Sequence, residues 1–357
     1  MEQRVIRALR SLKLCLAWLA ASAMVFAAPT ALAQTDAMAA IANLKGPERE
    51  ARLLAGAKKE GQLALYTSLE NSDAMKLTAA FEKRYGVKVV LWRSSSDAIL
   101  SRVLTETRGN RFVADVIETN GLELEALQRE KMLQPFRSPY TRELIADAVQ
   151  PHGQWIATRM HVYWVAYNTQ LIKKEDLPKS YSDLLDPAWK GKIGVEATNY
   201  PWFAAVIEEL GEREGLQLFR NIVKTNGIST RKGHNLLANL VASGEVPLAL
   251  TTNQQAIVKM KKGGAPVDGF FPQFGVAMLN GVAIQRNAPH PHAAALFADF
   301  MLSDGQDVLH ELDRQATARR HQSTSGTRLR MINASAVLDQ SAKWEKLYQD
   351  IVIAPAK

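Results

Sequence analysis

Cysteine is almost absent from the 357-residue chain, and the single one, Cys15, lies near the N-terminus. One cysteine can build neither a disulfide framework nor a cysteine-based metal site. Familiar catalytic motifs are missing too: the sequence has no Walker A loop, no GxGxxG opening a helix after a strand, no GxSxG, no HExxH and no CxxC. We therefore predict a protein that is not an enzyme and that carries no cofactor and no resident metal.

Long hydrophobic runs are scarce. The one at residues 14–28 follows a basic segment at residues 4–13 and precedes the small-residue motif Ala31-Leu32-Ala33. This order is typical of a secretory signal peptide, and the run is short for a membrane span. We expect cleavage after Ala33 and a soluble, periplasmic product, in preference to a retained membrane anchor. Cys15 and part of the net charge of +8 would leave with the leader.

Concentrated positive charge is also missing. The 44 basic residues are interspersed with 36 acidic ones and form no basic stripe with interleaved aromatics, so we expect no nucleic-acid partner. The arginine-rich stretch from Arg314 to Arg330 is interpreted as solvated surface.

Isolated chemical groups suggest no site by themselves. His290 and His292 flank Pro291 at a predicted helix start, which explains them without a metal. Glu123 and Glu125 lie on a predicted helix and indicate a solvated face. A carboxylate pair of an exported hydrolase stays an alternative.

Short β-rich runs alternate with helical stretches from Gly61 onward, a pattern typical of an α/β fold. Strands are predicted at 63–66, 87–92 and 114–117, each followed by a helix. A second α/β region begins at Lys192, and the long β-rich run at 155–167 is interpreted as a segment that crosses between two lobes. Two lobes are also the usual outcome for a chain of this length.

Polar loops follow five of the predicted strands, at residues 67–68, 94–96, 119–120, 198–200 and 251–255. In a parallel sheet such loops meet in a crevice beyond the carboxyl ends of the strands. Helix N-termini gathered there offer unpaired N–H groups to a polar or anionic ligand. The sequence thus predicts a binding cleft for a small polar organic solute, anionic solutes included.

Several segments between residues 61 and 305 carry a family resemblance. They are Tyr66-Thr67-Ser68, Ala80-Phe81-Glu82-Lys83-Arg84-Tyr85-Gly86, Ser94-Ser95-Ser96, Ala114-Asp115-Val116, Ala166-Tyr167-Asn168-Thr169, Asp186-Pro187-Ala188-Trp189-Lys190-Gly191-Lys192 and Asn280-Gly281-Val282-Ala283-Ile284. With these segments the chain resembles the periplasmic solute-binding proteins of ABC transporters, in the branch that binds ferric ion, thiamine, polyamines or phosphorylated compounds.

This resemblance implies a type II periplasmic-binding-protein fold of class α/β. Each lobe would be a mixed, mostly parallel sheet flanked by helices, with a ligand held at the hinge. We expect lobe 1 to comprise residues 34–162 and 275–357, and lobe 2 to comprise residues 163–274. The expected partners are a small-molecule solute and the membrane permease of an ABC transporter, with the protein itself a monomer.

The chain departs from the ferric binders at the positions of their metal ligands. Their adjacent tyrosines fall on the loop that here reads Thr252-Asn253-Gln254-Gln255, and their first-lobe histidine corresponds to Glu70. Amides are poor ligands for Fe(III) but good hydrogen-bond partners for an organic molecule. An oxygen-rich Fe(III) site built from Tyr66, Glu70 and Tyr200 stays the alternative. The candidate ligand-binding residues are Tyr66, Ser68, Glu70, Ser95, Ser96, Asn120, Tyr163, Thr198, Asn199, Tyr200, Asn253 and Gln254.

Overall fold

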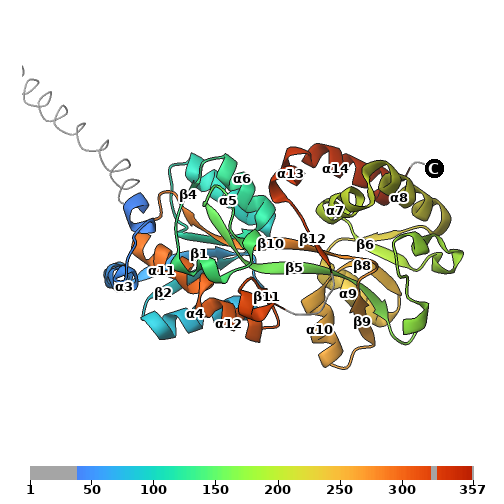
Figure 1. Cartoon of the computed structure of the whole chain (residues 1–357), viewed down its shortest axis with the longest axis horizontal. Coiled ribbons are helices and arrows are strands. Elements are labelled where there is room, and N and C mark those ends of the chain that lie inside the picture. Colours follow the sequence, from blue (N-terminus) through green and yellow to red (C-terminus); the bar gives the residue numbers. More distant parts are fainter. Residues whose placement is uncertain (1–37, 323–327, 356–357) are drawn as a thin grey trace, which may run out of the picture.

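Two α/β lobes lie side by side in the computed structural model, which describes residues 38–322 and 328–355 (Figure 1). The predicted signal peptide lies outside the described residues. Strands in that part of the chain form a 12-stranded sheet with the main order β2-β1-β3-β10-β5-β8-β6-β7. Strands β5 (Trp155–Asn168) and β10 (Gly275–Gln285) cross from one lobe to the other, joined by β12 (Leu329–Met331).

The first lobe contains α3 (Arg49–Glu60), β1 (Gln62–Thr67), α4 (Asn71–Tyr85), β2 (Lys88–Arg93), α5 (Ser96–Arg108), β3 (Val116–Asn120), α6 (Gly121–Arg129), β4 (Leu133–Gln134), α11 (Pro291–Leu302), α12 (Asp304–Glu311) and β11 (Gln315–Ala316). The second contains β6 (Ile193–Glu196), α7 (Tyr200–Leu210), α8 (Glu212–Asn226), β7 (Ser229–Arg231), α9 (His234–Ser243), β8 (Leu248–Asn253), α10 (Gln254–Lys262), β9 (Val267–Phe270), α13 (Ala334–Asp339) and α14 (Ser341–Tyr348). Parallel pairing joins β1 to β2 and β3, and β6 to β7 and β8, as expected for an α/β fold.

The two crossing strands form the hinge. β5 and β10 pair antiparallel from Trp155–Ala283 to Tyr163–Val276, with a register shift at Asn280 and Gly281. Gly281 is required there, because a Cβ atom would lie 2.7 Å from the carbonyl oxygen of Ile156. The two lobes are therefore connected by strands that pass directly from one sheet into the other.

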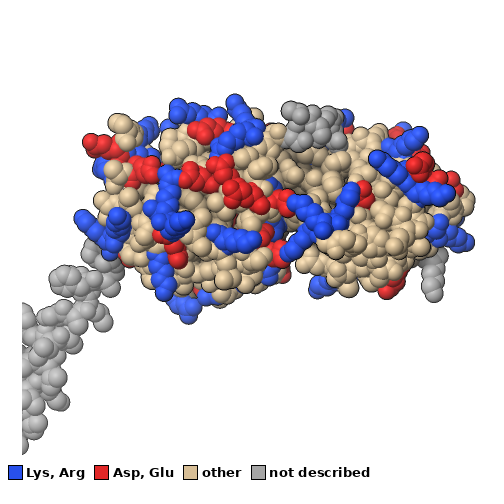
Figure 2. All heavy atoms as spheres, turned by 90° about the horizontal axis from the view of Figure 1, so that it is seen from below, with Lys and Arg blue, Asp and Glu red and all other residues tan. Residues whose placement is uncertain are grey.

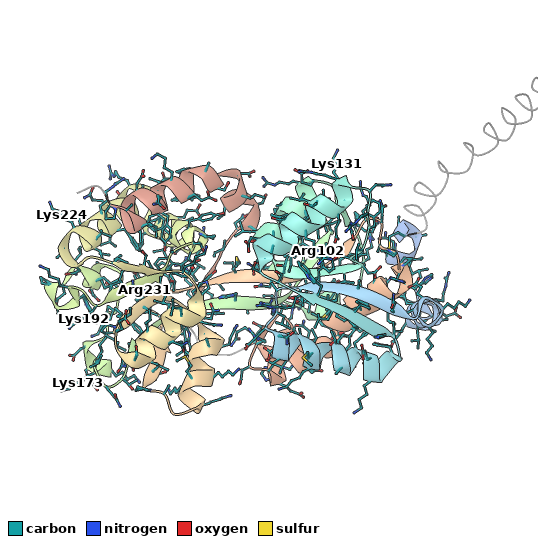
Figure 3. The ribbon with its side chains drawn as sticks, turned by 180° about the vertical axis from the view of Figure 1, so that it is seen from behind. Arg102, Lys131, Lys173, Lys192, Lys224 and Arg231 are labelled. Atoms are coloured by element: carbon teal, nitrogen blue, oxygen red, sulfur yellow. The ribbon has the colours of Figure 1, made fainter. Side chains whose placement is uncertain are left out.

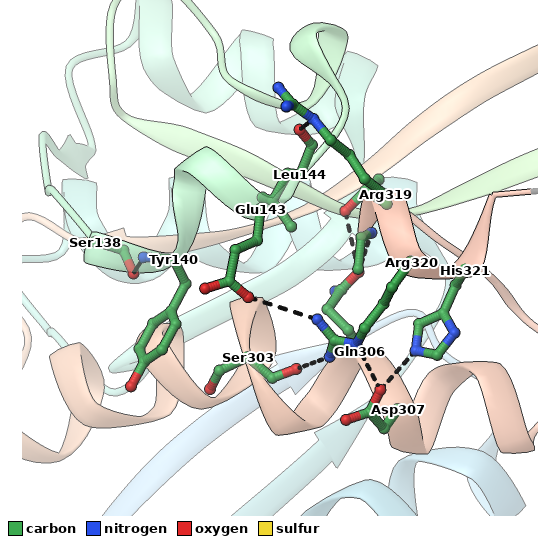
Figure 4. A network of polar contacts seen from close by, with 12 residues as sticks. Ser138, Tyr140, Glu143, Leu144, Ser303, Gln306, Asp307, Arg319, Arg320 and His321 are labelled. Carbon is green, nitrogen blue, oxygen red and sulfur yellow. Dashed lines mark hydrogen bonds and ion pairs between the residues drawn. The ribbon is translucent and has the colours of Figure 1, made fainter.

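The chain returns to the hinge after α12 through a segment fastened to the first lobe (Figure 4). Asp307 accepts a hydrogen bond from Arg320 at 2.9 Å and contacts His321 at 2.6 Å. Arg319 donates to the carbonyl oxygen of Leu144 at 2.8 Å. This network holds residues 315–321 beside β5, so Arg314 at its beginning has a fixed place.

Of the three hydrophobic clusters among the described residues, the two largest meet on β5. The first extends to Val162, and the second begins at Tyr163. The second core also takes Val337, Trp344 and Tyr348 from the C-terminal helices. The expectation that all of residues 275–357 belong to lobe 1 thus differs from the packing, and we propose that residues 332–353 belong to lobe 2.

No helix among the described residues is long and apolar enough to cross a membrane. The most apolar one, α11, is buried along its whole length from Ala293 to Leu302. It packs beside α3 within the first lobe.

Candidate functional site

A cavity of about 610 Å³ opens between the lobes. Its first-lobe wall comes from the start of α4 and the end of α12, and its second-lobe wall comes from α9 and α10. Polar side chains line it from both sides: Glu70, Ser72, Asp73, Lys76, Asn235, Asn239, Asn253, Gln255, Lys259, Glu311, Asp313 and Arg314. The volume is that of a small-molecule site.

Three polar side chains alternate along β5 and therefore share one face of the hinge. Arg159 pairs with Glu118 of β3 at 3.0 Å, and both are almost fully buried. His161 hydrogen-bonds to Asn253 at the edge of the cavity, and burial lowers the pKa of His161 to about 3. The ring of Tyr163 lies 4.8 Å from that of His161. This face of β5 therefore carries the Arg159–Glu118 ion pair at one end and the uncharged rings of His161 and Tyr163 at the other.

The interpretation of the arginine-rich stretch as solvated surface is wrong for Arg314. Only 7% of its side chain is exposed, and its Nε donates to Asp73 at 2.7 Å. Its Nη2 also reaches Glu70 at 3.4 Å, while no hydrogen bond joins its Nη1 to any residue that the structure describes. Arg314, Lys76 and Lys259 all line the cavity, so basic groups stand on both of its walls.

Glu123 and Glu125 are not a solvated face either. Glu125 is buried and hydrogen-bonded to Trp155 and His152. Glu123, in the first turn of α6, has an Oε2 atom that is buried without a hydrogen-bond partner. Burial, followed by the charge of Asp97, raises the pKa of Glu123 to about 7. The helical pattern could not reveal this, because it does not report which other groups, such as Asp97, surround a polar side chain in the folded protein.

Three of the predicted residues reach the cavity region. Glu70 and Asn253 line the main cavity, and Gln254 lines an adjoining pocket of about 350 Å³. Gln255, which was not among the candidates, lines both. It follows Gln254 on the loop where the ferric binders have their tyrosines, so the same signal could have identified it.

The polar loops predicted around the cleft hold one another in place. Asn120 accepts a hydrogen bond from Asn280 of β10 at 2.6 Å. Both the N–H and the hydroxyl of Thr198 donate to Glu196, which also accepts from the N–H of Gly233. Ser95 stands at the N-cap position of α5 without a capping hydrogen bond from its side chain, which bonds to Asp97 instead, while Ser68 and Ser96 are half-buried. Asn120, Thr198, Ser68, Ser95 and Ser96 are not among the described residues that line the main cavity.

The aromatic candidates divide into two groups. Burial is the main cause of the raised pKa of Tyr163 and of Tyr200, and the charge of Glu123 adds to it, ahead of Glu196 for Tyr163 and after Glu345 for Tyr200. Asn199, beside Tyr200, is buried with an unpartnered Nδ2. Tyr66 is different: it lies in the first-lobe core and donates to Glu106 at 3.0 Å. The guanidinium of Arg102, a residue of the first lobe labelled in Figure 3, lies over its ring. Its hydroxyl is therefore not available to a solute.

The two neighbouring histidines, His290 and His292, contact different carboxylates. His290 bonds to Asp115 at 2.8 Å, whereas His292 bonds to Glu60 at 2.7 Å. Within residues 38–322 and 328–355 no three His, Cys, Asp or Glu side chains are grouped so as to hold a metal ion. Over the face in Figure 2, basic and acidic side chains are interspersed.

Comparisons with known proteins agree with this architecture. The sequence pattern described as bacterial extracellular solute-binding protein matches residues 67–308. Iron uptake protein A1 of Synechocystis sp. is 25% identical over 264 residues, which cover 69% of this chain and 72% of the relative. The Fe(3+)-binding periplasmic protein of Serratia marcescens is 25% identical over 259 residues, covering 69% and 75%.

Solved structures share the two-lobed fold. Iron-bound HitA from Pseudomonas aeruginosa superposes with a TM-score of 0.69 at 24% identity, covering 81% of this chain and 99% of HitA. AfuA from Actinobacillus pleuropneumoniae, with fructose-6-phosphate bound, gives 0.71 at 22% identity and covers 83% and 100%. At these identities the likeness establishes the fold, and the sequence match establishes the kinship: the chain belongs to the bacterial extracellular solute-binding proteins.

Proposed function

We propose that the protein is the periplasmic solute-binding component of an ABC importer and captures a small polar organic solute between its lobes. The observation that carries this proposal is the interlobe cavity of about 610 Å³, lined by polar groups from both sides. A space of this size suits a molecule of many atoms better than a single ion. The protein acts as a monomer that delivers its solute to a membrane permease, without nucleic acid and without catalysis.

The chemistry of the cavity supports an organic solute. Carboxamides contribute from Asn235, Asn239, Asn253 and Gln255, and each offers both a donor and an acceptor. Arg314 adds a nearly buried cation with one unpaired nitrogen. No tyrosine stands among the described residues that line this cavity. Hydrogen-bonding groups of both kinds favour a solute with several polar substituents, and Arg314 favours one that includes an anionic group, as the fructose-6-phosphate of AfuA does.

Closure of the lobes is the step that would connect binding to transport. α4 and α10 face each other across the cavity on opposite sides of the β5–β10 hinge. A solute that contacts both walls stabilises the closed form, because the open form offers only one set of contacts at a time. The permease would then distinguish loaded from empty protein by its shape.

Ferric iron is the second candidate, favoured by the iron-binding relatives. Tyr66 cannot contribute to the site first considered, because its hydroxyl is bonded to Glu106. The carboxylates that line the cavity are Glu70, Asp73, Glu311 and Asp313. Glu70 and Asp73 pair with Arg314, so an iron site at these two carboxylates would have to displace that arginine.

Native mass spectrometry of the protein as purified tests both functions. An organic molecule retained in equal stoichiometry, or a thermal shift produced by a member of a panel of phosphonates, sugar phosphates, carboxylates and amines, supports the organic solute. A visible charge-transfer band with Fe(III) and citrate, together with no shift from any panel member, would replace it by iron. Turnover of the retained molecule would contradict a pure binding function.

A further inference from the structure

A second cavity, of about 350 Å³, adjoins the main one. One of its walls comes from the first two turns of α10 in the second lobe, and the other comes from residues 310–322 of the first lobe. The two cavities share three lining residues, Gln255, Asp313 and Arg314. The second cavity is itself large enough for part of a small molecule, so one solute can occupy both.

The lining of the second cavity is mainly basic. The described residues that line it include four basic side chains, those of Arg314, Arg320, His310 and His321. The one acid among them, Asp313, pairs with Lys262 at 2.7 Å. The carboxylates that pair with Arg314 and Arg320 are not part of this lining: Glu70, Asp73, Glu143 and Asp307. This arrangement favours an acidic group, because guanidinium groups bind carboxylates and phosphates through strong, charge-assisted hydrogen bonds.

The first-lobe wall of the second cavity is held in place by its own contacts. Gln322 donates to the carbonyl oxygens of Ala316 and Ala318 at 2.7 and 2.9 Å. His321 contacts Asp307 at 2.6 Å, and its ring stacks on that of His310 with 4.2 Å between the ring centres (Figure 4). A wall that is fixed before the ligand arrives loses little freedom on binding.

Other polar groups of the same lining have no hydrogen-bond partner among the residues that the structure describes. They are the Nη1 of Arg314, the ring of His310 and the side-chain amides of Gln254, Gln255 and Gln315. Only 7% of the Arg314 side chain is exposed, and it stands where the two cavities adjoin. The second cavity therefore offers several donors to a ligand.

From these observations we propose that the solute extends from the main cavity into the second one, where it places a terminal acidic group, a carboxylate or a phosphate, beside Arg314. The inference rests on the proposed function and narrows it to solutes that are long enough to reach both cavities and acidic at one end. Because α10 and residues 310–322 belong to different lobes, the acidic group also connects the lobes.

The test compares acids with neutral partners of similar skeleton at two lengths. The carboxylate arm pairs gluconate with sorbitol and lactobionate with lactitol. The phosphate arm pairs glucose 6-phosphate with glucose and trehalose 6-phosphate with trehalose. Binding at millimolar concentration is measured by tryptophan fluorescence and thermal shift, and native mass spectrometry identifies any molecule that the purified protein retains.

The variants are Gln254→Glu and its matched control Asn239→Asp. Each replaces a carboxamide by a carboxylate, but Gln254 lines only the second cavity and Asn239 only the main one. Gln254 is the first residue of α10, where an acidic side chain is compatible with the helix, so Gln254→Glu should fold. His310→Gln, at an exposed position of the second cavity, is the substitute if it does not.

We expect the long acid of at least one arm to bind about tenfold more tightly than its neutral partner, which is the scale of one charge-assisted hydrogen bond. The short acid shows a smaller preference. Gln254→Glu loses the preference for the long acid, because its carboxylate repels the acidic group, whereas Asn239→Asp keeps it. His310→Gln weakens the same preference.

Four outcomes overturn the role of the second cavity while leaving an organic solute in place. They are an acid preference of equal size at both lengths, a preference that survives Gln254→Glu and His310→Gln, no binding of any long acid, and a retained organic molecule without an acidic group. Binding of Fe(III) with citrate and of no organic compound overturns the proposed function as well.

Discussion

At the scale of single residues, the Arg159–Glu118 ion pair is the most deeply buried charge contact of the hinge. Both side chains are at most 6% exposed, and Thr67 also donates to Glu118. Removal of one partner leaves the other charge without compensation in a site that water does not reach. The pair therefore links the first-lobe strands β1 and β3 to the crossing strand β5.

We expect Arg159→Met to lower the free energy of unfolding by about 3–5 kcal/mol in urea denaturation, because Glu118 is left buried and unpaired. The double variant Glu118→Met with Arg159→Met should recover most of the loss, since no buried charge is then left alone. A single variant as stable as the wild type would show that the pair is solvated in solution.

The raised pKa of Glu123 makes a second residue-scale prediction. Burial and Asp97 shift that pKa from 4.5 to about 7, so the folded protein holds the proton more tightly than the unfolded chain. Ionisation of Glu123 therefore destabilises the fold as the pH rises from about 4.5 to about 7. In calorimetry the Tm of Glu123→Gln minus that of the wild type should grow across this window and stay constant on either side. A difference that does not change with pH would mean that Glu123 titrates normally.

The contrast between Glu123 and the exposed Glu130 also shows that the sequence pattern of a helix does not predict which of its polar side chains are buried. Both lie at α6: the sequence pattern predicts a helix from Leu122 to Glu130, and the structure has it over Gly121–Arg129. The charge of Glu123 contributes to the raised pKa of Tyr163 and Tyr200, two residues that have no fixed spacing from α6 in the sequence. Periodicity reports which face of a helix is apolar, but it carries no information on a polar group enclosed by a distant segment.

At the scale of elements, α10 faces the first lobe across the mouth of the cavity. Lys262 pairs with Asp313 at 2.7 Å between the lobes, whereas its neighbour Lys261 pairs with Asp268 at 2.8 Å within the second lobe. All four side chains are substantially exposed, so each pair contributes at most about 1 kcal/mol. Such a contribution can still shift an equilibrium between open and closed forms that differ by little.

Lys262→Glu should favour the open form, since two carboxylates would then face each other across the mouth. The expected result is a larger radius of gyration than that of the wild type in small-angle X-ray scattering at low salt, with the difference lost near 1 M salt. Lys261→Glu is the matched control, because its charge reversal lies within one lobe and should leave the radius unchanged. Equal effects of the two variants would exclude a specific role for the interlobe pair.

The order of the elements was accessible from local patterns, including the long crossing strand at 155–167 and the helices that follow each polar loop. The lobe that the C-terminal helix α14 joins was not accessible in this way. α14 packs on α7, and Tyr348 lies 5.4 Å from Phe203, almost 150 positions earlier in the chain. Contacts at such separations follow from the completed fold and not from the pattern of either helix.

At the scale of the whole molecule, each lobe has its own core, and the C-terminal helices belong to that of the second. Trp344 is 1% exposed and packs edge-on against Phe203 at 6.4 Å. We expect Trp344→Ala to cost about 3–5 kcal/mol, as for other large-to-small core changes. In hydrogen exchange the loss of protection should concentrate in α7 and α8.

Phe300→Ala is the corresponding core change in the first lobe, because Phe300 is buried among the aromatic rings of that lobe. That variant should expose α3 and α4 to exchange and leave α7 protected. Loss of protection in both lobes with either change would indicate that they unfold as one cooperative unit.

Residues on the two cavity walls can be labelled with dyes to follow the movement of the lobes. Lys76 on α4 and Asn239 on α9 line the cavity from different lobes, and no cysteine occurs among the described residues. A thiol introduced at either position would be the sole reactive site of a chain that has lost its leader. A donor dye at one position and an acceptor dye at the other would convert movement of the lobes into a change in energy transfer. Solute binding could then be measured before the solute is identified.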